Sequence, residues 1–196
     1  RRQRQMCIRD SYAGRTPDQI FTLESDFDAE TLVTTLKNAG FKKLIVTAKH
    51  HDGFCIWNSA YTDYDIASTS YKNGEGDILA EISEACTAAN MDMGLYLSPW
   101  DVAESTFGAN GGTIDNAYNE YYNNQLEEIL SNPKYGNKGH FVEVWMDGAN
   151  GYNNVPQTYN FEKCTCMTHT INSCSFYQLI WHRIKELPCD KQVHRL

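Results

Sequence analysis

Three short polar segments of this 196-residue chain hold the residue types that could do chemistry. They read KHHDGF (49–54), SPWD (98–101) and DGANG (147–151), and each follows an apolar run. A carboxylate such as Asp147 in that position is costly to desolvate unless it is hydrogen-bonded or functional. Asp-Gly is also a common turn pair with a local mechanism of its own. Spacing alone therefore leaves Asp147 open between a turn former and a catalyst.

The adjacent pair His50 and His51 allows three readings. Neighbours on a regular strand point to opposite faces, so the two rings can share a pocket only if the backbone turns between them. They could bind a metal, although no HExxH motif or carboxylate trio accompanies them. They could be hydrogen-bonded inside a loop for purely structural reasons. Neutral imidazoles offer both a donor and an acceptor, which suits sugar hydroxyls, and we prefer that hypothesis.

Aromatic side chains gather in or beside the same polar segments. For any one of them, packing in the core is the more common role. Together they fit the apolar face of a sugar ring, which favours a carbohydrate ligand. The residues are Trp57, Tyr61, Tyr64, Tyr71, Tyr96, Trp100 and Trp145.

Regular elements must position these segments, and hydrophobic periodicity predicts three helices and three buried strands. The helices are expected within 26–40, 76–91 and 117–132, and the strands at 44–48, 93–98 and 141–146. Asp26 or Asp28 would cap the first helix, and Gly40 would end it. Alternating helices and strands predict parallel βαβ units, so the fold class is α/β.

A parallel sheet gathers the polar segments at the carboxyl ends of its strands. Both a closed barrel and an open doubly wound sheet place their sites there. Neither GxGxxG nor GxxxxGKS follows any of the expected strands, which argues against a nucleotide ligand. The net charge of −8 argues against a nucleic-acid partner. The sequence has no run of about 18 apolar residues, so no membrane span is predicted.

The two ends of the chain differ in composition from the middle. Residues 1–11 are basic and resemble the translation of a sequencing adaptor, so we interpret them as non-native, with a disordered arm as the alternative. Residues 164–196 contain four of the seven cysteines and carry a weak helical pattern in FYQLIWHRIKEL. We interpret this tail as divergent or out of frame, although a real helix is the alternative. The pairing of CTC with His169 is a poor zinc pattern.

Five blocks of the middle segment resemble the α-L-fucosidases of glycoside hydrolase family 29. In order, they are TAKHHDGFCIWNSAYTDYDI, GDILAEISEAC, GLYLSPWD, YNEYYNNQLEEIL and EVWMDGANG. The resemblance runs from about Phe27 to Lys163, and five blocks in the right order are specific where any single block is not. It implies a partial (β/α)8-like, TIM-type barrel, of which this chain would supply about strands 2 to 4.

The resemblance also implies the chemistry. Such enzymes remove terminal α-L-fucosyl residues from glycans with retention, without a metal or organic cofactor. Asp147 matches the catalytic nucleophile, and His50 and His51 match the pair that binds fucose hydroxyls. Tyr96, Trp145 and Trp57 would line the same pocket. The partner would be a fucosylated oligosaccharide or glycoconjugate, and family members are often exported.

The second carboxylate of a retaining pair has no match in this chain. Neither Glu162 nor Glu186 lies in a recognisable motif, so neither is assigned as the acid/base. We therefore expect the 196-residue chain alone to be inactive. The alternatives to a fucosidase are a carbohydrate-binding remnant without turnover and a different barrel hydrolase, including a metal-dependent one.

Overall fold

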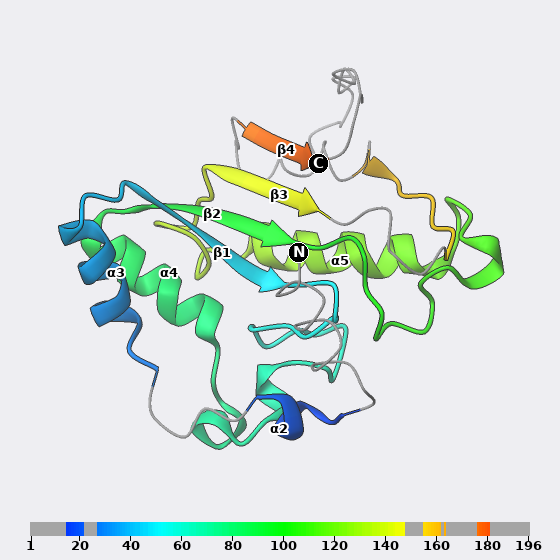
Figure 1. The fold of residues 1–196 in the computed structure, drawn as a ribbon, viewed down its shortest axis with the longest axis horizontal. Coiled ribbons are helices and arrows are strands. Elements are labelled where there is room, and N and C mark those ends of the chain that lie inside the picture. The colour runs from blue at the N-terminus through cyan, green and yellow to red at the C-terminus, as the bar shows by residue number, and fades with distance from the viewer. Residues whose placement is uncertain (1–14, 22–26, 148–154, 162, 164–175, 181–196) are drawn as a thin grey trace, which may run out of the picture.

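The computed structural model describes residues 15–21, 27–147, 155–161, 163 and 176–180. Its centre is a four-stranded sheet in the order β1-β2-β3-β4, and each neighbouring pair is parallel. The strands are β1 (Lys43–Lys49), β2 (Asp92–Leu97), β3 (Glu143–Asp147) and β4 (Phe176–Ile180). Because they run in the same direction, their carboxyl ends lie at one edge of the sheet (Figure 1).

The three predicted helices are confirmed as α3 (Ala29–Asn38), α4 (Ile78–Ala89) and α5 (Ala117–Ser131). Short helical segments occur at α2 (Pro17–Ile20), η1 (Ile66–Ser68), η2 (Tyr71–Gly74) and η3 (Ala109–Gly111). Of the two cap candidates, Asp28 begins α3, since its Oδ1 accepts a hydrogen bond from the Thr31 amide at 2.8 Å. Gly40 follows the helix at φ +93°, a conformation that favours glycine.

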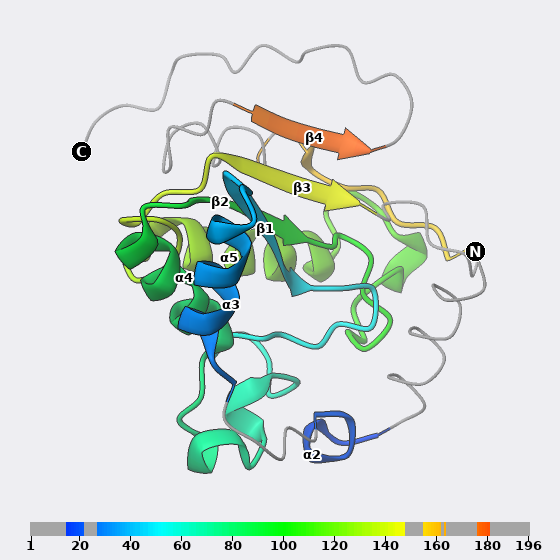
Figure 2. The ribbon, with the colours of Figure 1, turned by 60° about the vertical axis from the view of Figure 1, so that its left-hand side comes forward.

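The sheet buries one face against these helices. One core cluster joins Met93, Leu95 and Leu97 of β2 to buried side chains of both α4 and α5. Helices α3 and α4 also pack side by side (Figure 2). The strand order follows the chain order without a reversal in the described part of the sheet, whereas a doubly wound sheet reverses its order at a switch point. The described strands therefore favour a sheet that winds in one direction.

The other face of the sheet carries a different set of side chains. Along β1, buried Val46 and Ala48 alternate with exposed Ile45 and Thr47, as the pleat of a strand requires. Trp145 and Asp147 of β3 are half-buried, in contrast to buried Met146 between them. The candidate functional residues on β3 thus lie on the face away from the helical core.

Two sequence predictions need correction. The pattern in FYQLIWHRIKEL is not helical at its start, because residues 176–180 form β4 and pair with β3 in parallel. Asp147 does not follow the third strand but ends it, and it pairs with Ile180. The pairing of β3 with β4 is the reason for both differences, and local periodicity in the sequence does not show pairing between distant segments. The interpretation of 164–196 as out of frame stays a prediction, and residues 1–11 lie outside the described residues.

Replacing the N-cap of α4 tests how this helix is anchored. Asp77 Oδ1 accepts from the Ala80 amide at 2.9 Å, and its Oδ2 accepts from Tyr135 Oη at 2.8 Å and Lys134 Nζ at 2.9 Å. Asp77→Ala should lower the free energy of unfolding by about 2–4 kcal/mol, because it removes the cap and leaves the hydroxyl of buried Tyr135 without its acceptor.

Urea unfolding of the full product of the gene that encodes this chain is the measurement. Asp77→Asn is the matched control, since an amide oxygen still accepts from the helix amide. Equal losses in Asp77→Ala and Asp77→Asn would contradict the capping role.

Candidate active site

The predicted site residues of β2 and β3 meet at the carboxyl edge of the sheet. Asp147 is the last residue of β3, and its Oδ2 accepts a hydrogen bond from Tyr96 Oη of β2 at 3.2 Å. In the ladder, Tyr96 pairs with Trp145, two residues before Asp147. The parallel register therefore places the Tyr96 hydroxyl beside the Asp147 carboxylate.

The histidine pair lies in a turn directly after β1. The Gly53 amide donates to the His50 carbonyl at 3.0 Å, which marks the bend that the sequence required. As a result the two imidazole centroids lie 4.0 Å apart. His50 stacks on Tyr96 at 5.8 Å and 11°, and His51 lies 4.7 Å from the Trp100 ring. Both histidines thus join the group around Asp147.

Ser98 connects this group. Its Oγ lies 2.7 Å from His51 Nδ1 and 3.3 Å from the carbonyl oxygen of Asp147. It therefore joins the turn after β1 to the end of β3. We call the set His50, His51, Tyr96, Ser98, Trp100 and Asp147 the strand-end cluster.

Trp145 lies on the same face of β3 as Asp147 and is half-buried. Its indole N–H donates to Glu143, which also forms an ion pair with Lys43. Burial raises the pKa of the Glu143 carboxyl, but the hydrogen bonds from Lys43 and Trp145 and the positive charge of Lys43 outweigh that effect, so the pKa lies below its ordinary value. A charged Glu143 thus holds the orientation of the Trp145 ring.

Trp57 was expected in the pocket, but the structure places it in the core. Its side chain is 0% exposed, and its indole N–H donates to Glu128 Oε2 of α5 at 2.9 Å. Glu128 also accepts from Ser59 Oγ and from the Ala60 amide. Because its ring has no exposed face, Trp57 anchors the loop after β1 against α5.

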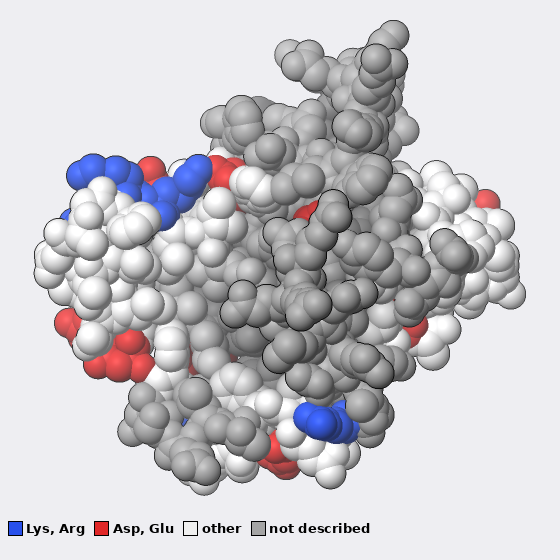
Figure 3. Space-filling view, viewed as in Figure 1, with Lys and Arg blue, Asp and Glu red and all other residues white. Residues whose placement is uncertain are grey.

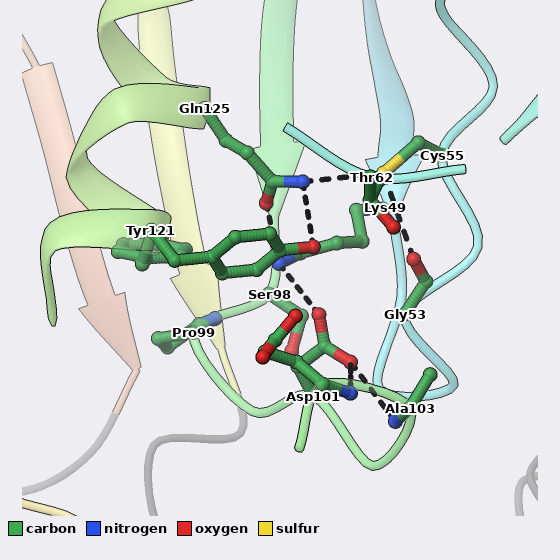
Figure 4. Close-up of polar contacts among 12 residues, drawn as sticks. Lys49, Gly53, Cys55, Thr62, Ser98, Pro99, Asp101, Ala103, Tyr121 and Gln125 are labelled. Carbon is green, nitrogen blue, oxygen red and sulfur yellow. Dashed lines mark hydrogen bonds and ion pairs between the residues drawn. The ribbon is translucent and has the colours of Figure 1, made fainter. Parts of the chain in front are cut away.

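A buried ion pair lies beside the strand-end cluster (Figure 4). Lys49 Nζ is 3.0 Å from Asp101 Oδ2, and both side chains are at most 1% exposed. Lys49 ends β1 and Asp101 follows β2, so the pair joins the loops that carry His51 and Ser98. Lys49 also donates to Gln125 Oε1 of α5 at 2.8 Å, which ties these loops to the helical layer.

The neighbours of the ion pair leave it little freedom. Asp101 Oδ1 accepts from the amides of Ala103 and Glu104, both at 3.0 Å. A Cβ added at Gly53 would lie 2.3 Å from that oxygen, so the turn after the histidines has room only for glycine. Desolvation raises the pKa of the nearby Cys55 thiol well above its ordinary value despite the opposing charge of Lys49, and the thiol stays neutral.

Sequence reasoning gave no role to Lys49, Ser98 or Asp101, although all three lie in the quoted polar segments. A lysine at the last position of an apolar strand was the available signal, since a buried ammonium requires a counter-charge. Its partner could not be found from spacing, because 52 positions separate Lys49 from Asp101.

The described residues also bear on metal binding and on membrane insertion. Among them, no group of three or more His, Cys, Asp or Glu side chains could hold a metal ion. No helix in the part of the chain that is described is long and apolar enough to cross a membrane. In the view of Figure 3, described Lys and Arg side chains gather mainly at one corner, with acidic side chains beside them.

Comparison with known proteins decides the family. A family model described as alpha-L-fucosidase matches residues 12–189. The chain belongs to the α-L-fucosidase family. Alpha-L-fucosidase 1 of Arabidopsis thaliana is 40% identical over 158 residues, which cover 81% of this chain and 29% of that relative. The family resemblance inferred from the five sequence blocks is thereby confirmed.

Solved structures of family members share the fold. A Ruminococcus gnavus GH29 fucosidase in complex with fucose is 62% identical, with a TM-score of 0.76. The match covers 82% of this chain and 34% of that one. A glycoside hydrolase 29 family member from an unknown rumen bacterium is 33% identical, with a TM-score of 0.69, over 83% of this chain and 29% of its own. The chain thus spans about a third of the length of these relatives.

Breaking the buried ion pair should destabilise the fold strongly. Asp101→Asn leaves Lys49 buried without a counter-charge, and we expect the free energy of unfolding to fall by about 3–5 kcal/mol. Urea unfolding of the full gene product measures the loss. The double variant Lys49→Met with Asp101→Asn should recover most of it, because no unpaired charge remains and the Asn oxygen still accepts from the loop amides.

Glu81→Gln is the control for a more exposed pair. Glu81 binds Lys72, whose side chain is 42% exposed, so this loss should stay below about 1 kcal/mol. A double variant as unstable as Asp101→Asn would show that the charge pair is not the source of the effect.

Proposed function

We propose that this chain carries part of the active site of a retaining α-L-fucosidase, which removes terminal α-L-fucosyl residues from glycans with Asp147 as nucleophile. The observation that carries the proposal is the placement of Asp147 in a chain of this family. Its carboxylate ends β3, accepts from Tyr96 and shares the strand-end cluster with both histidines. An Asp that only formed a turn after the strand would not need a tyrosine hydroxyl and two histidines beside it.

The chemistry proceeds in two displacements. The Asp147 carboxylate attacks the anomeric carbon while the glycosidic C–O bond breaks, and a carboxylic acid protonates the departing oxygen. Water then attacks the same carbon, the carboxylate formed in the first step takes its proton, and Asp147 is released. The Tyr96 hydroxyl donates to Oδ2 at 3.2 Å and so holds the orientation of the attacking carboxylate.

The acid/base carboxylate is not assigned to any residue of this chain. A retaining pair needs its two carboxyl groups about 5–5.5 Å apart. Glu162 and Glu186 both lie outside the described residues. In the proposed site, the chain supplies the nucleophile and part of the sugar pocket.

Sugar recognition falls to side chains around Asp147. His50 and His51 present imidazole nitrogens to hydroxyl groups, and half-buried Trp145 offers a ring on the nucleophile's own strand. Tyr96 lies between His50 and Asp147. Trp57 has no part in this pocket, because it is fully buried against α5.

We propose further that β1 to β4 are consecutive strands of a (β/α)8-type barrel. The support is the parallel sheet in chain order without a reversal, with α4 and α5 packed into one core cluster against β2. Such barrels place their sites at the carboxyl ends of the strands, where the strand-end cluster lies. Exposed Ile45 on the other face would then point into the barrel interior.

Removing the nucleophile is the direct test of function. Asp147→Ala in the full gene product should lower kcat for a nitrophenyl α-L-fucoside by on the order of a thousandfold or more, because the covalent step is lost. Added azide should restore turnover and give the β-fucosyl azide, since a small anion can fill the space of the lost carboxylate.

Glu84→Gln, an exposed carboxylate change on α4, is the matched control and should keep full activity. Fucose binding in calorimetry without any wild-type turnover would favour a carbohydrate-binding protein instead. Unchanged activity in Asp147→Ala would remove the proposed nucleophile.

The 196-residue chain expressed alone provides a further prediction. We expect no measurable nitrophenol release, because a retaining mechanism needs a second carboxylate that no motif of this chain supplies. We also expect poor solubility, since Phe41 and Ile45 are 56% and 37% exposed. Turnover by the purified chain would show that one of its own carboxylates serves as the acid/base.

A further inference from the structure

The Ser98 hydroxyl has four polar neighbours but only one proton to donate, so few arrangements of its hydrogen bonds are possible. The residue is 0% exposed and follows β2 directly. Its Oγ lies 2.7 Å from the Trp100 carbonyl oxygen, 3.1 Å from the Trp100 amide, 2.7 Å from His51 Nδ1 and 3.3 Å from the Asp147 carbonyl oxygen. The position of its single proton therefore follows from what these partners can do.

Two of the four partners can only accept, and one can only donate. A carbonyl oxygen has no proton, so the Ser98 proton belongs to the Trp100 carbonyl at 2.7 Å or is shared with the Asp147 carbonyl. The Trp100 amide donates to one lone pair of Oγ. If the hydroxyl instead donated to His51, the Trp100 carbonyl and Oγ would face each other as two acceptors at 2.7 Å. That arrangement is repulsive.

The remaining contact then has a fixed direction. His51 Nδ1 lies 2.7 Å from an oxygen whose proton is already used, so Nδ1 must carry the proton and donate it. In a neutral imidazole the other nitrogen, Nε2, then holds a lone pair and can only accept. The neighbouring ring of Trp100, 4.7 Å away, further restricts how the imidazole can reorient.

We propose that Ser98 is a positioning residue that holds His51 in the Nδ1–H tautomer, so that Nε2 accepts a hydrogen bond from a hydroxyl of the sugar. The ligand part of this inference rests on the proposed function, whereas the tautomer does not. The same hydroxyl contacts the Asp147 carbonyl, so it also sets the spacing between the His51 ring and the end of β3. A sugar hydroxyl at His51 must act as the donor, which a fluorine substituent cannot do.

Nitrogen-15 NMR of the full gene product labelled at histidine tests the tautomer directly. The His51 signals are identified by their loss in His51→Asn. At neutral pH we expect Nδ1 to carry the proton and Nε2 to show the shift of an unprotonated nitrogen. An Nε2–H tautomer, or an imidazolium with both nitrogens protonated, would overturn the proposal without any reference to activity.

Ser98→Ala tests whether the serine is the cause. Without the Oγ acceptor, His51 should shift toward a mixture of tautomers, whereas an unchanged Nδ1–H signal would overturn the role of Ser98. Ser83→Ala is the matched control, because Ser83 is also buried and its Oγ donates to the Leu79 carbonyl at 2.6 Å in α4. It should leave the His51 signals unchanged. If Ser98→Ala fails to fold, Ser98→Cys replaces it, since a thiol has nearly the same shape and accepts weakly.

The kcat/KM values of modified substrates give a second test. Their ratio would not change if Ser98 only stabilised the fold. In the wild type, the deoxyfluoro fucoside altered at the hydroxyl bound by His51 should have no advantage in kcat/KM over the deoxy fucoside. An unprotonated Nε2 cannot donate to fluorine, and electron withdrawal by fluorine disfavours the oxocarbenium-like transition state. In Ser98→Ala the fluoro compound should regain about tenfold over the deoxy compound, because an Nε2–H can donate to fluorine. The same ratio of kcat/KM between the fluoro and deoxy compounds in the wild type and in Ser98→Ala would overturn the proposal. Absence of any fucoside turnover would instead refute the proposed function and leave the tautomer result standing.

Discussion

The candidate site depends on the buried ion pair between Lys49 and Asp101. Two charges removed from water are stable only if each is well paired, so this contact fixes where the loop after β1 lies against the loop after β2. Gln125 extends the contact to α5, and Gly53 leaves Asp101 the space it needs. The turn that brings His50 and His51 together starts at this pair.

The strand-end cluster shows how a parallel sheet assembles a polar site from distant segments. Asp147, Tyr96 and the histidine pair come from the ends of three strands, and the ladder register sets their spacing. Short side-chain contacts then complete the arrangement, with Ser98 between His51 and the backbone of Asp147. The polar atoms of the cluster hold one another in place, so few of them would need to be ordered on binding a ligand.

Much of this could be predicted from the sequence, and the failures have physical causes. Helices α3, α4 and α5 could be predicted because each has a clear hydrophobic period and begins at a capping side chain. The first three strands could be predicted because each is a short apolar run. Strand β4 was missed because its pattern is weak and its pairing with β3 is not local. Trp57 was assigned to the pocket because the sequence does not distinguish an aromatic side chain that lines a site from one that is buried in the core behind it. Only burial against Glu128 separates them.

The sequence by itself determined the fold class, the three polar segments and membership of the α-L-fucosidase family, since these depend on residue types, periods and ordered motifs. Tertiary structure alone decided that Asp147 ends its strand and meets Tyr96, that Lys49 pairs with Asp101, and that Ser98 joins His51 to β3. The reason is distance along the chain. About fifty positions separate the partners of each side-chain contact, and only strand register and close packing bring them within hydrogen-bonding range.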